Sequence, residues 1–399
     1  MVNIVHINLN ARGGSERLAL ATIAALKGID DIDVDLTTFQ KPDLNKIQRS
    51  YGKIGLLALR SIKTVNIIRS IETVRLKKDY DLTINTHGDM LPFSQKGFSK
   101  NNAITYCHFP LAKYLIDVEN EEYSRLLYGL RCSNILDYRE NLHSARNMYF
   151  DMMRTSSVFT NSEYSRKAIR KTFDIDSTVL SPPVDVNLFR KNVLFSSKNE
   201  REDMILIISR FHPSKKIENA IRLAKLLKRN GIGRRMKIVG NLSPAMLRYY
   251  HYLKQTVQHQ DLSDYVNFQV NVSFDKLLSL ICEAKVYFHP LPGEPFGIST
   301  VEAMSAGLIP VVPDIGGHTE FVPSKYQFHT FPEAVESIAV AMDASFSERI
   351  RISNSVRRFS ISNYIKRFQE IVKKILLIST NTDYQKIKSL SPIVSRHIR

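Results

Sequence analysis

The 399-residue chain contains no tryptophan, only three cysteines, and only 16 glycines and 15 prolines. The cysteines, Cys107, Cys132 and Cys282, are odd in number and follow no metal-ligand spacing, which argues against a disulfide framework or a zinc site. The low glycine and proline content, with 43% hydrophobic residues, argues against long disorder and fibrous repeats. The sequence therefore predicts a globular protein of two or three domains in a reducing compartment.

The sequence also lacks the segments that direct proteins into or across membranes. It has no run of about 18 or more apolar residues, which argues against a transmembrane helix. Residues 1–10 fit a short strand rather than a charged segment followed by an apolar one, so we expect no secretion signal. We expect a cytoplasmic protein, with any membrane contact being peripheral, on the cytoplasmic face.

Positive charge is the main compositional excess, with 56 lysines and arginines against 39 aspartates and glutamates, a formal net charge of +17. Residues 41–78 hold ten basic and two acidic residues, residues 350–399 hold eleven and two, and elsewhere the signs balance. Such an excess suits either nucleic acid or an anionic membrane surface. No nucleic-acid-binding motif is recognisable, whereas a helix over 53–78 would interleave cations with apolar residues, as membrane-docking helices do. Packing of that helix within the protein is the alternative.

Short β-branched runs alternate with helical stretches along most of the chain, which predicts parallel sheets with crossover helices. Each predicted helix lies between two strands; the first covers 15–27, with Ser15 as its N-cap and Gly28 as its end. The predicted strands are 2–8, 34–39, 82–85, 103–108, 158–160 and 178–181 in the first half, and 204–209, 236–240, 266–270, 285–289 and 309–313 in the second.

A polar stretch over 195–203, preceded by two prolines, interrupts this alternation and marks the domain linker. The sequence predicts an α/β protein with two doubly wound, Rossmann-like domains facing across a cleft. The first covers residues 1–190 and the second residues 191–365. Residues 366–399 form a basic helix and tail that could cross back to the first domain. In such sheets ligands bind beyond the carboxyl ends of the strands, so the motifs there carry the functional argument.

The most informative segment begins at the end of the predicted strand 285–289 and has the sequence HPLPGEPFGISTVEAMSAG. It combines a Pro/Gly loop with an apolar helix, whose unpaired N–H groups and positive dipole end suit a phosphate group. Two carboxylates, Glu294 and Glu302, flank this anion site with seven residues between them. A carboxylate is unfavourable beside phosphate, so we expect both to bind sugar and ribose hydroxyl groups. A rigid turn with an ordinary helix residue is the alternative.

A second loop, after the strand 204–209, carries Arg210 and Lys215. Two fixed cations at the start of a helix can neutralise a pyrophosphate leaving group without a metal ion. A solvated basic loop is the alternative for this segment taken alone.

A third loop follows the strand 309–313 and contains Gly316, Gly317 and Glu320. The two glycines allow the backbone to approach a ligand closely, and Glu320 could hydrogen-bond hydroxyl groups. A simple turn is the alternative.

These three loops, in this order and at this spacing, resemble the retaining two-domain (GT-B) glycosyltransferases of the large family 4, the group 1 type. The resemblance covers nearly the whole chain, and the Glu-x7-Glu string is its specific part. It implies that Arg210 and Lys215 bind the donor diphosphate, Glu294 the donor sugar and Glu302 the ribose; family members often have glycine where this chain has Lys216. The implied donor-binding positions are Gly13, Gly14, Phe296, Gly297, Ile298, Glu302, Gly317 and Glu320.

In the first half, Gly13 and Gly14 form a strand-to-helix turn where the backbone can pass close to phosphate or sugar. The turn is not a G-x-G-x-x-G fingerprint, which disfavours a nicotinamide or flavin cofactor. Two histidines follow strands; we interpret His87 as structural and, from the resemblance, His108 as a donor-sugar contact. The string YCHFP at 106–110 is similar to the mannosyltransferases that extend dolichol-linked oligosaccharides.

The sequence thus predicts a retaining hexosyltransferase, with mannose favoured, acting on a glycan or polyprenyl-linked acceptor. The expected donor is a nucleotide-diphosphate sugar, GDP-mannose favoured, with no cofactor and no metal, since the cations Arg210 and Lys215 would take the place of Mg²⁺. The expected catalytic residues are His108, Glu294, Arg210 and Lys215. The alternatives are a sugar-nucleotide epimerase, which needs no acceptor, a phosphorylase, which needs inorganic phosphate, and a basic nucleic-acid-binding protein.

Overall fold

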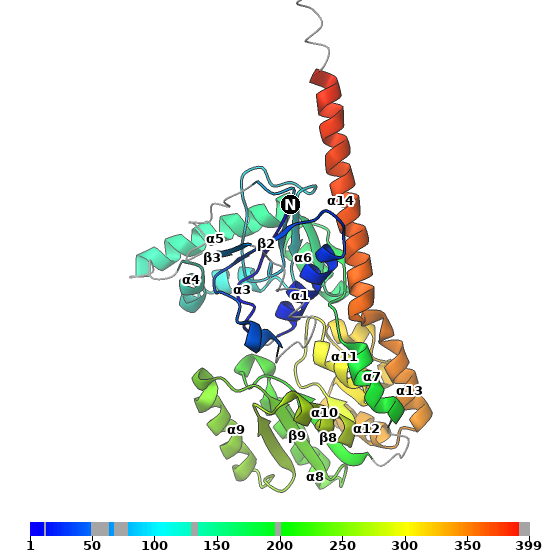
Figure 1. The fold of residues 1–399 in the computed structure, drawn as a ribbon. Coiled ribbons are helices and arrows are strands. Elements are labelled where there is room, and N and C mark those ends of the chain that lie inside the picture. Colours follow the sequence, from blue (N-terminus) through cyan, green and yellow to red (C-terminus); the bar gives the residue numbers. More distant parts are fainter. Residues whose placement is uncertain (12, 49–63, 68–78, 129–134, 196–200, 391–399) are drawn as a thin grey trace, which may run out of the picture. The chain divides into compact units, whose positions relative to one another are not determined.

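The computed structural model describes residues 1–11, 13–48, 64–67, 79–128, 135–195 and 201–390. They form two compact units, whose elements are labelled in Figure 1. Unit 1 comprises Met1–Asn161, Ser165–Pro183 and the chain from Ser362 onward, and unit 2 comprises Ser162–Tyr164 and Val184–Ile361. The unit boundaries thus fall at 183/184 and 361/362, where the sequence suggested 190/191 and 365/366.

Unit 1 is built on a parallel sheet with the strand order β3-β2-β1-β4-β5-β6-β7. The central strands are buried along their whole length, as expected for parallel strands covered by helices on both faces. The strands are β1 (Val2–Val5), β2 (Val34–Thr38), β3 (Thr64–Ile67), β4 (Leu82–Asn85), β5 (Ala103–Tyr106), β6 (Ser157–Thr160) and β7 (Thr178–Val179). The helices between them are α1 (Gly14–Lys27), α3 (Leu111–Asp117), α4 (Glu121–Tyr128), α5 (Ile135–Thr155) and α6 (Glu163–Phe173).

Unit 2 has a second parallel sheet, with the strand order β10-β9-β8-β11-β12-β13. Its strands are β8 (Glu202–Ile208), β9 (Arg235–Gly240), β10 (Val266–Val270), β11 (Ala284–Phe288), β12 (Ile309–Pro313) and β13 (Gln327–Phe328). Its helices are α7 (Val186–Phe195), α8 (Ile217–Arg229), α9 (Leu247–His259), α10 (Phe274–Glu283), α11 (Ile298–Ser305), α12 (Phe331–Met342) and α13 (Phe346–Ser355). Two doubly wound α/β units were predicted from the alternation of strands and helices, and this fold class is confirmed.

Helix α1 begins one residue earlier than predicted, and the predicted N-cap is wrong. Gly13 is the N-cap, no side chain caps the helix, and the Ser15 hydroxyl donates a hydrogen bond to Glu16 Oε1 at 3.1 Å instead. The helix ends as predicted at Gly28, whose N–H donates to carbonyl groups of the last turn.

The predicted helix over 53–78 is wrong at residues 64–67, which form strand β3. This strand pairs in parallel with β2, with Thr64 opposite Asp35 and Ile67 opposite Thr38. Three of its four residues, Thr64, Val65 and Ile67, are β-branched and favour a strand. The other residues of that helix, and with them most of the basic segment 41–78, lie outside the described residues.

The C-terminal helix α14 (Ile361–Leu390) packs against unit 1, the first part of the chain. Tyr364, Phe368 and Val372, one helical turn apart, are buried in the same apolar core as β1 and α1. The Tyr364 hydroxyl lies 2.7 Å from the Thr22 hydroxyl of α1. Among the described side chains of this helix, Lys366, Lys373 and Lys374 are exposed on the opposite side, whereas the exposed Arg367 donates a hydrogen bond to the Val179 carbonyl of unit 1 at 3.3 Å.

Candidate active site

The topology of unit 2 places two of the predicted loops side by side. From β8 the chain proceeds to β9 and β10 on one side, whereas β11, β12 and β13 follow on the other side. The loops that leave the adjacent strands β8 and β11 therefore diverge at the switch point of the sheet, which is where sheets of this kind bind their ligands. Lys215 comes from the loop after β8 and Glu294 from the loop after β11.

Lys215 and Glu294 form an ion pair at this switch point. The Lys215 Nζ donates to Glu294 Oε2 at 2.9 Å, and the two side chains are 24% and 15% exposed. His289 Nε2 lies 3.5 Å from the same oxygen, Oε2. Both contacts fall on Oε2, which leaves the other carboxylate oxygen available to a ligand. The arrangement brings together two of the four residues predicted to be catalytic.

The charge state of Glu294 follows from its neighbours. Burial would raise the pKa of Glu294, but Lys215 and the hydrogen-bonding and charge interactions with His289 outweigh it and hold that pKa well below its usual range. Glu294 is therefore a carboxylate at every physiological pH. An ionised carboxylate accepts hydrogen bonds from hydroxyl groups. The ammonium group of Lys215, which pairs with it, is positioned to bind a second anionic group as well.

Tyr287 and Ser299, on the interior side of this site, hold His289 in position. Its Nδ1 lies 3.0 Å from the Tyr287 hydroxyl, which lies 2.8 Å from the Ser299 hydroxyl at the start of α11. His289 is 4% exposed and Tyr287 is fully buried. The sequence analysis treated His289 only as the end of a strand; its position one residue beyond β11, in the same loop as Glu294, was the available signal.

The glycine pair after β12 has a structural use in this site. Glu294 forms an isolated parallel bridge with Gly316, and the Gly317 N–H donates to the Glu294 carbonyl at 2.8 Å. A Cβ atom at Gly317 would lie 2.0 Å from the Pro295 carbonyl oxygen, so only glycine fits there. The two loops are thereby fastened together; a direct ligand contact of Gly317 stays a prediction.

The start of α11 has the form that the sequence predicted. Gly297 is the N-cap and has a φ of 93°, in the region that favours glycine, and Ile298 is the first helical residue. The Phe296 ring is buried against Phe321 and Phe359, so the side chain belongs to the core and leaves the backbone to face a ligand. Glu302 lies in the second turn of α11 and is 8% exposed.

Two predicted residues of unit 2 lie at its surface. Arg210 is exposed in the loop after β8. Glu320 is exposed as well, and its Oε1 accepts a hydrogen bond from the backbone N–H of Tyr164 at 2.9 Å. The predicted contact of Glu320 with sugar hydroxyl groups stays a prediction.

The backbone conformation of Lys216 explains why glycine suits the position after Lys215. Its backbone is left-handed, with φ 50° and ψ 44°, which costs a residue other than glycine about 1–2 kcal/mol. Glycine loses about 0.5–1 kcal/mol in backbone entropy, so we expect Lys216→Gly to raise the stability of unit 2 by about 0.5–1 kcal/mol. Denaturant unfolding measures this gain. Binding of GDP should be unchanged, because the lysine predicted to hold the diphosphate is Lys215, which is fixed by its ion pair with Glu294; weaker GDP binding would instead assign the phosphate contact to Lys216.

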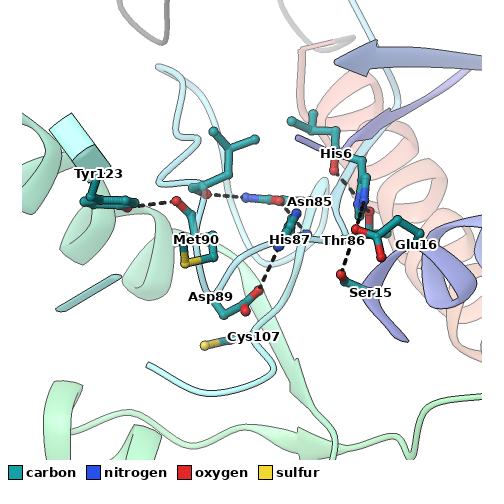
Figure 2. Close-up of polar contacts among 12 residues, drawn as sticks. His6, Ser15, Glu16, Asn85, Thr86, His87, Asp89, Met90, Cys107 and Tyr123 are labelled. Carbon is teal, nitrogen blue, oxygen red and sulfur yellow. Dashed lines mark hydrogen bonds and ion pairs between the residues drawn. The ribbon is translucent and has the colours of Figure 1, made fainter. Parts of the chain in front are cut away.

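In unit 1 the predicted residues gather near the carboxyl ends of β1, β4 and β5. Gly13 and Gly14 begin α1, and a Cβ atom at Gly13 would lie 2.6 Å from Glu16 Oε2. His108 packs against the Tyr106 ring at 4.8 Å, and burial lowers the pKa of His108 to about 4. Figure 2 shows the polar side chains of this region, among them His6 and Glu16, which the sequence analysis missed because a lone histidine and one helical glutamate carry no pattern.

Within the described residues, no group of three His, Cys, Asp or Glu side chains is placed to hold a metal ion. None of the helices in the described part of the chain combines the length and the apolar composition that crossing a bilayer requires.

The fold and the site define the class of protein. Residues 190–364 match the family "Glycosyl transferases group 1". Solved GT-B glycosyltransferases have the same fold as the whole chain. A glycosyltransferase from Rickettsia africae aligns with a TM-score of 0.62 at 12% identity, over 94% of this chain and 98% of that one. The Anabaena protein HepE, solved with UDP-glucose, aligns with a TM-score of 0.62 at 16% identity, over 94% and 99%. Residues 190–364 thus match group 1 glycosyltransferases, and the fold is that of the solved glycosyltransferases.

The curated relatives are mannosyltransferases. The Dictyostelium discoideum "GDP-Man:Man(3)GlcNAc(2)-PP-Dol alpha-1,2-mannosyltransferase" is 29% identical over 55% of this chain and 47% of its own length. The human protein of the same name is 26% identical over 55% and 48%. The O-antigen chain mannosyltransferase of Salmonella typhimurium is 28% identical over 53% and 57%. The chain spans about half the length of the curated relatives it matches.

Proposed function

We propose that the protein is a retaining mannosyltransferase, which moves mannose from GDP-mannose to a glycan or polyprenyl-linked acceptor. The single observation that carries the proposal is the Lys215–Glu294 pair at the switch point of unit 2, beside the start of α11. A fixed cation and a helix N-terminus suit a diphosphate, and an ionised carboxylate suits sugar hydroxyl groups. The names of the curated relatives favour GDP-mannose as the donor and a lipid-linked glycan as the acceptor.

In the proposed reaction, a hydroxyl group of the acceptor attacks the anomeric carbon on the face that the diphosphate leaves. The new bond joins the acceptor oxygen to the anomeric carbon, and the bond from that carbon to the phosphate oxygen breaks. Lys215, Arg210 and the N–H groups at the start of α11 stabilise the negative charge of the leaving diphosphate. The phosphate oxygen takes the proton of the acceptor, so the reaction needs no side-chain base. Glu294 orients the donor sugar, and Glu302 binds the ribose.

A screen of nucleotide sugars tests the donor. In a thermal-shift series of GDP-mannose, GDP, UDP-glucose, UDP and ADP-glucose, we expect GDP-mannose and GDP to give the largest shifts. Preference for a uridine or adenosine donor would overturn the assignment of GDP-mannose, and no shift with any donor would count against the proposed function. Consumption of the donor without an acceptor would instead favour an epimerase.

The basic face of α14 suits peripheral attachment to the cytoplasmic surface of a membrane. Lys366, Lys373 and Lys374 lie opposite the residues that pack on unit 1, so they can face an anionic surface. We expect the double charge reversal Lys366→Glu and Lys373→Glu to reduce the affinity for vesicles of anionic phospholipid, measured by sedimentation, by about 30-fold or more, on the order of 1 kcal/mol for each cation lost. The exposed reversal Lys225→Glu in α8 is the control. Equal sedimentation of the double variant and the control would remove α14 as the attachment surface.

A further inference from the structure

The switch point of unit 1 lies between β1 and β4, and it carries a group of ionisable side chains of its own. It corresponds to the position in unit 2 where Lys215 and Glu294 meet. Each residue of the group lies in a loop that follows a strand or in the first turn of α1, and Figure 2 shows four of the five together. We define this polar cluster as His6, Glu16, His87, Asp89 and His108.

Contacts within the polar cluster are close, but few of them are hydrogen bonds. His6 Nδ1 lies 3.0 Å from the Thr86 hydroxyl, and His6 Nε2 lies 3.7 Å from Glu16 Oε1. The His6 and His87 rings stack with centroids 4.8 Å apart and an interplanar angle of 21°. His87 Nε2 lies 4.0 Å from Asp89 Oδ1, which is an ion-pair distance and too long for a hydrogen bond.

Four enclosed polar atoms of the cluster have no hydrogen-bond partner among the described residues. Native proteins rarely leave such atoms unpaired, because each loses its hydration without compensation. Four of them together, at the ligand-binding end of a parallel sheet, indicate a site that is completed by a bound molecule or by water. The atoms are His6 Nε2, His87 Nδ1, Asp89 Oδ1 and His108 Nε2.

The chemistry of these atoms selects the ligand. Glu16 and Asp89 place two carboxyl groups in the cluster, which disfavours a phosphate group. Carboxylate oxygens accept hydrogen bonds, and a neutral imidazole has one donor and one acceptor nitrogen, so the cluster suits a ligand whose groups can both donate and accept, as hydroxyl groups do. His87 Nδ1 and Asp89 Oδ1 are enclosed, but the side chains as a whole are 15% and 14% exposed, so a ligand can reach them through their other atoms. His6 is fully buried.

We propose that His87 and Asp89 form a monosaccharide-binding site in unit 1, in which they hydrogen-bond neighbouring hydroxyl groups of one sugar ring. The inference rests on the proposed function for the origin of that sugar, which is either the donor's hexose or the terminal residue of the acceptor. His6 and Glu16 act behind them as positioning residues, since His6 stacks on the His87 ring and Glu16 faces His6. The sequence analysis had interpreted His87 as structural and had not selected Asp89.

Binding of methyl α-D-mannopyranoside to the full chain tests the site, because this probe contains no nucleotide. Titration followed by NMR should show binding to the wild-type protein and binding weaker by about tenfold or more for Asp89→Asn and Asp89→Leu. His87→Gln should weaken it to a similar extent. Asp30→Asn, an exposed aspartate of unit 1, is the control and should bind as the wild type does. GDP binding should stay unchanged in every variant, since the nucleotide contacts proposed above lie in unit 2.

Steady-state kinetics of the same variants then identify the source of the sugar. A higher KM for GDP-mannose assigns the site to the donor, and a higher KM for the acceptor assigns it to the acceptor. Equal sugar binding by the wild type and Asp89→Leu, or no sugar binding by the wild type, would overturn the inference and indicate that water fills the cluster. Failure of the proposed function would look different, because GDP and all nucleotide sugars would then fail to bind.

Discussion

Replacing Glu294 by glutamine should lower the rate of mannose transfer by about 100-fold or more, while unit 2 stays folded. Glutamine has the size of glutamate but no charge, so it cannot pair with Lys215, whose Nζ lies 2.9 Å from Glu294 Oε2. Because the pKa of Glu294 is held well below its usual range, the wild-type residue is ionised throughout the working pH range. Its loss therefore removes a full negative charge from the site.

Lys215→Met should have an effect of similar size with a different signature. It removes the cation that faces the diphosphate, so GDP binding should weaken together with the transfer rate. Glu294→Gln should leave GDP binding nearly intact, because the carboxylate contacts the sugar. Radiolabelled transfer measures the rate and calorimetry measures GDP binding, with the exposed Glu336→Gln of α12 as a matched control. Full transfer activity in both variants would contradict the assignment of the site.

Asp89→Asn should be more stable than the wild type at pH 8, by about 2–3 kcal/mol, and equally stable at pH 4. Burial raises the pKa of Asp89 from 3.8 to about 7 in the folded protein. Between these two values the folded state binds more protons than the unfolded state, so the stability due to this group falls as the pH rises from 4 to 7. The whole change in the pKa of Asp89 would correspond to about 4 kcal/mol in the free energy of unfolding. Because the side chain is 14% exposed, its contact with water reduces this free energy.

Hydrogen exchange of the β4 amides at pH 6 and 8 measures this effect in unit 1 alone, and denaturant unfolding extends the comparison to pH 4. Asp30→Asn controls for the loss of an exposed aspartate, and it should follow the wild-type pH dependence. An Asp89→Asn variant with the wild-type pH dependence would show that the Asp89 carboxyl group is not desolvated. Greater stability combined with weaker sugar binding would instead be typical of a residue retained for function.

The functional loops of unit 2 could be predicted because each one follows a β-branched strand in the sequence. Glu294 and Lys215 were placed correctly at the carboxyl ends of β11 and β8, and the topology brings those two strands together. The chain of polar contacts from Ser299 through Tyr287 to His289 could not be predicted, since it depends on how β11 faces α11. The hydrogen bond from Tyr164 to Glu320 spans 156 residues and leaves no local signal.

Strand β3 shows where periodicity fails. Apolar residues over 53–78 fit a helical repeat, yet residues 64–67 pair with β2. The parallel neighbour satisfies the backbone hydrogen bonds of a strand that is too short to be recognised alone.

The polar cluster of unit 1 could not be predicted for a different reason. His6 and Asp89 are far apart in sequence, and only the adjacency of β1 and β4 brings them together. His6 directly follows β1, Glu16 lies in the first turn of α1 and Asp89 lies in the loop after β4, which was the available signal.

Transfer of mannose by the purified chain tests the central claim most directly. The protein would be incubated with GDP-mannose and a polyprenyl-diphosphate-linked glycan, and the anomeric configuration of the product would be determined by NMR. We expect an α-linked mannose, since the donor is an α-anomer and the proposed transfer retains it, and we expect no product with Glu294→Gln. A β-linked product, or transfer that persists after loss of both Lys215 and Glu294, would contradict the account.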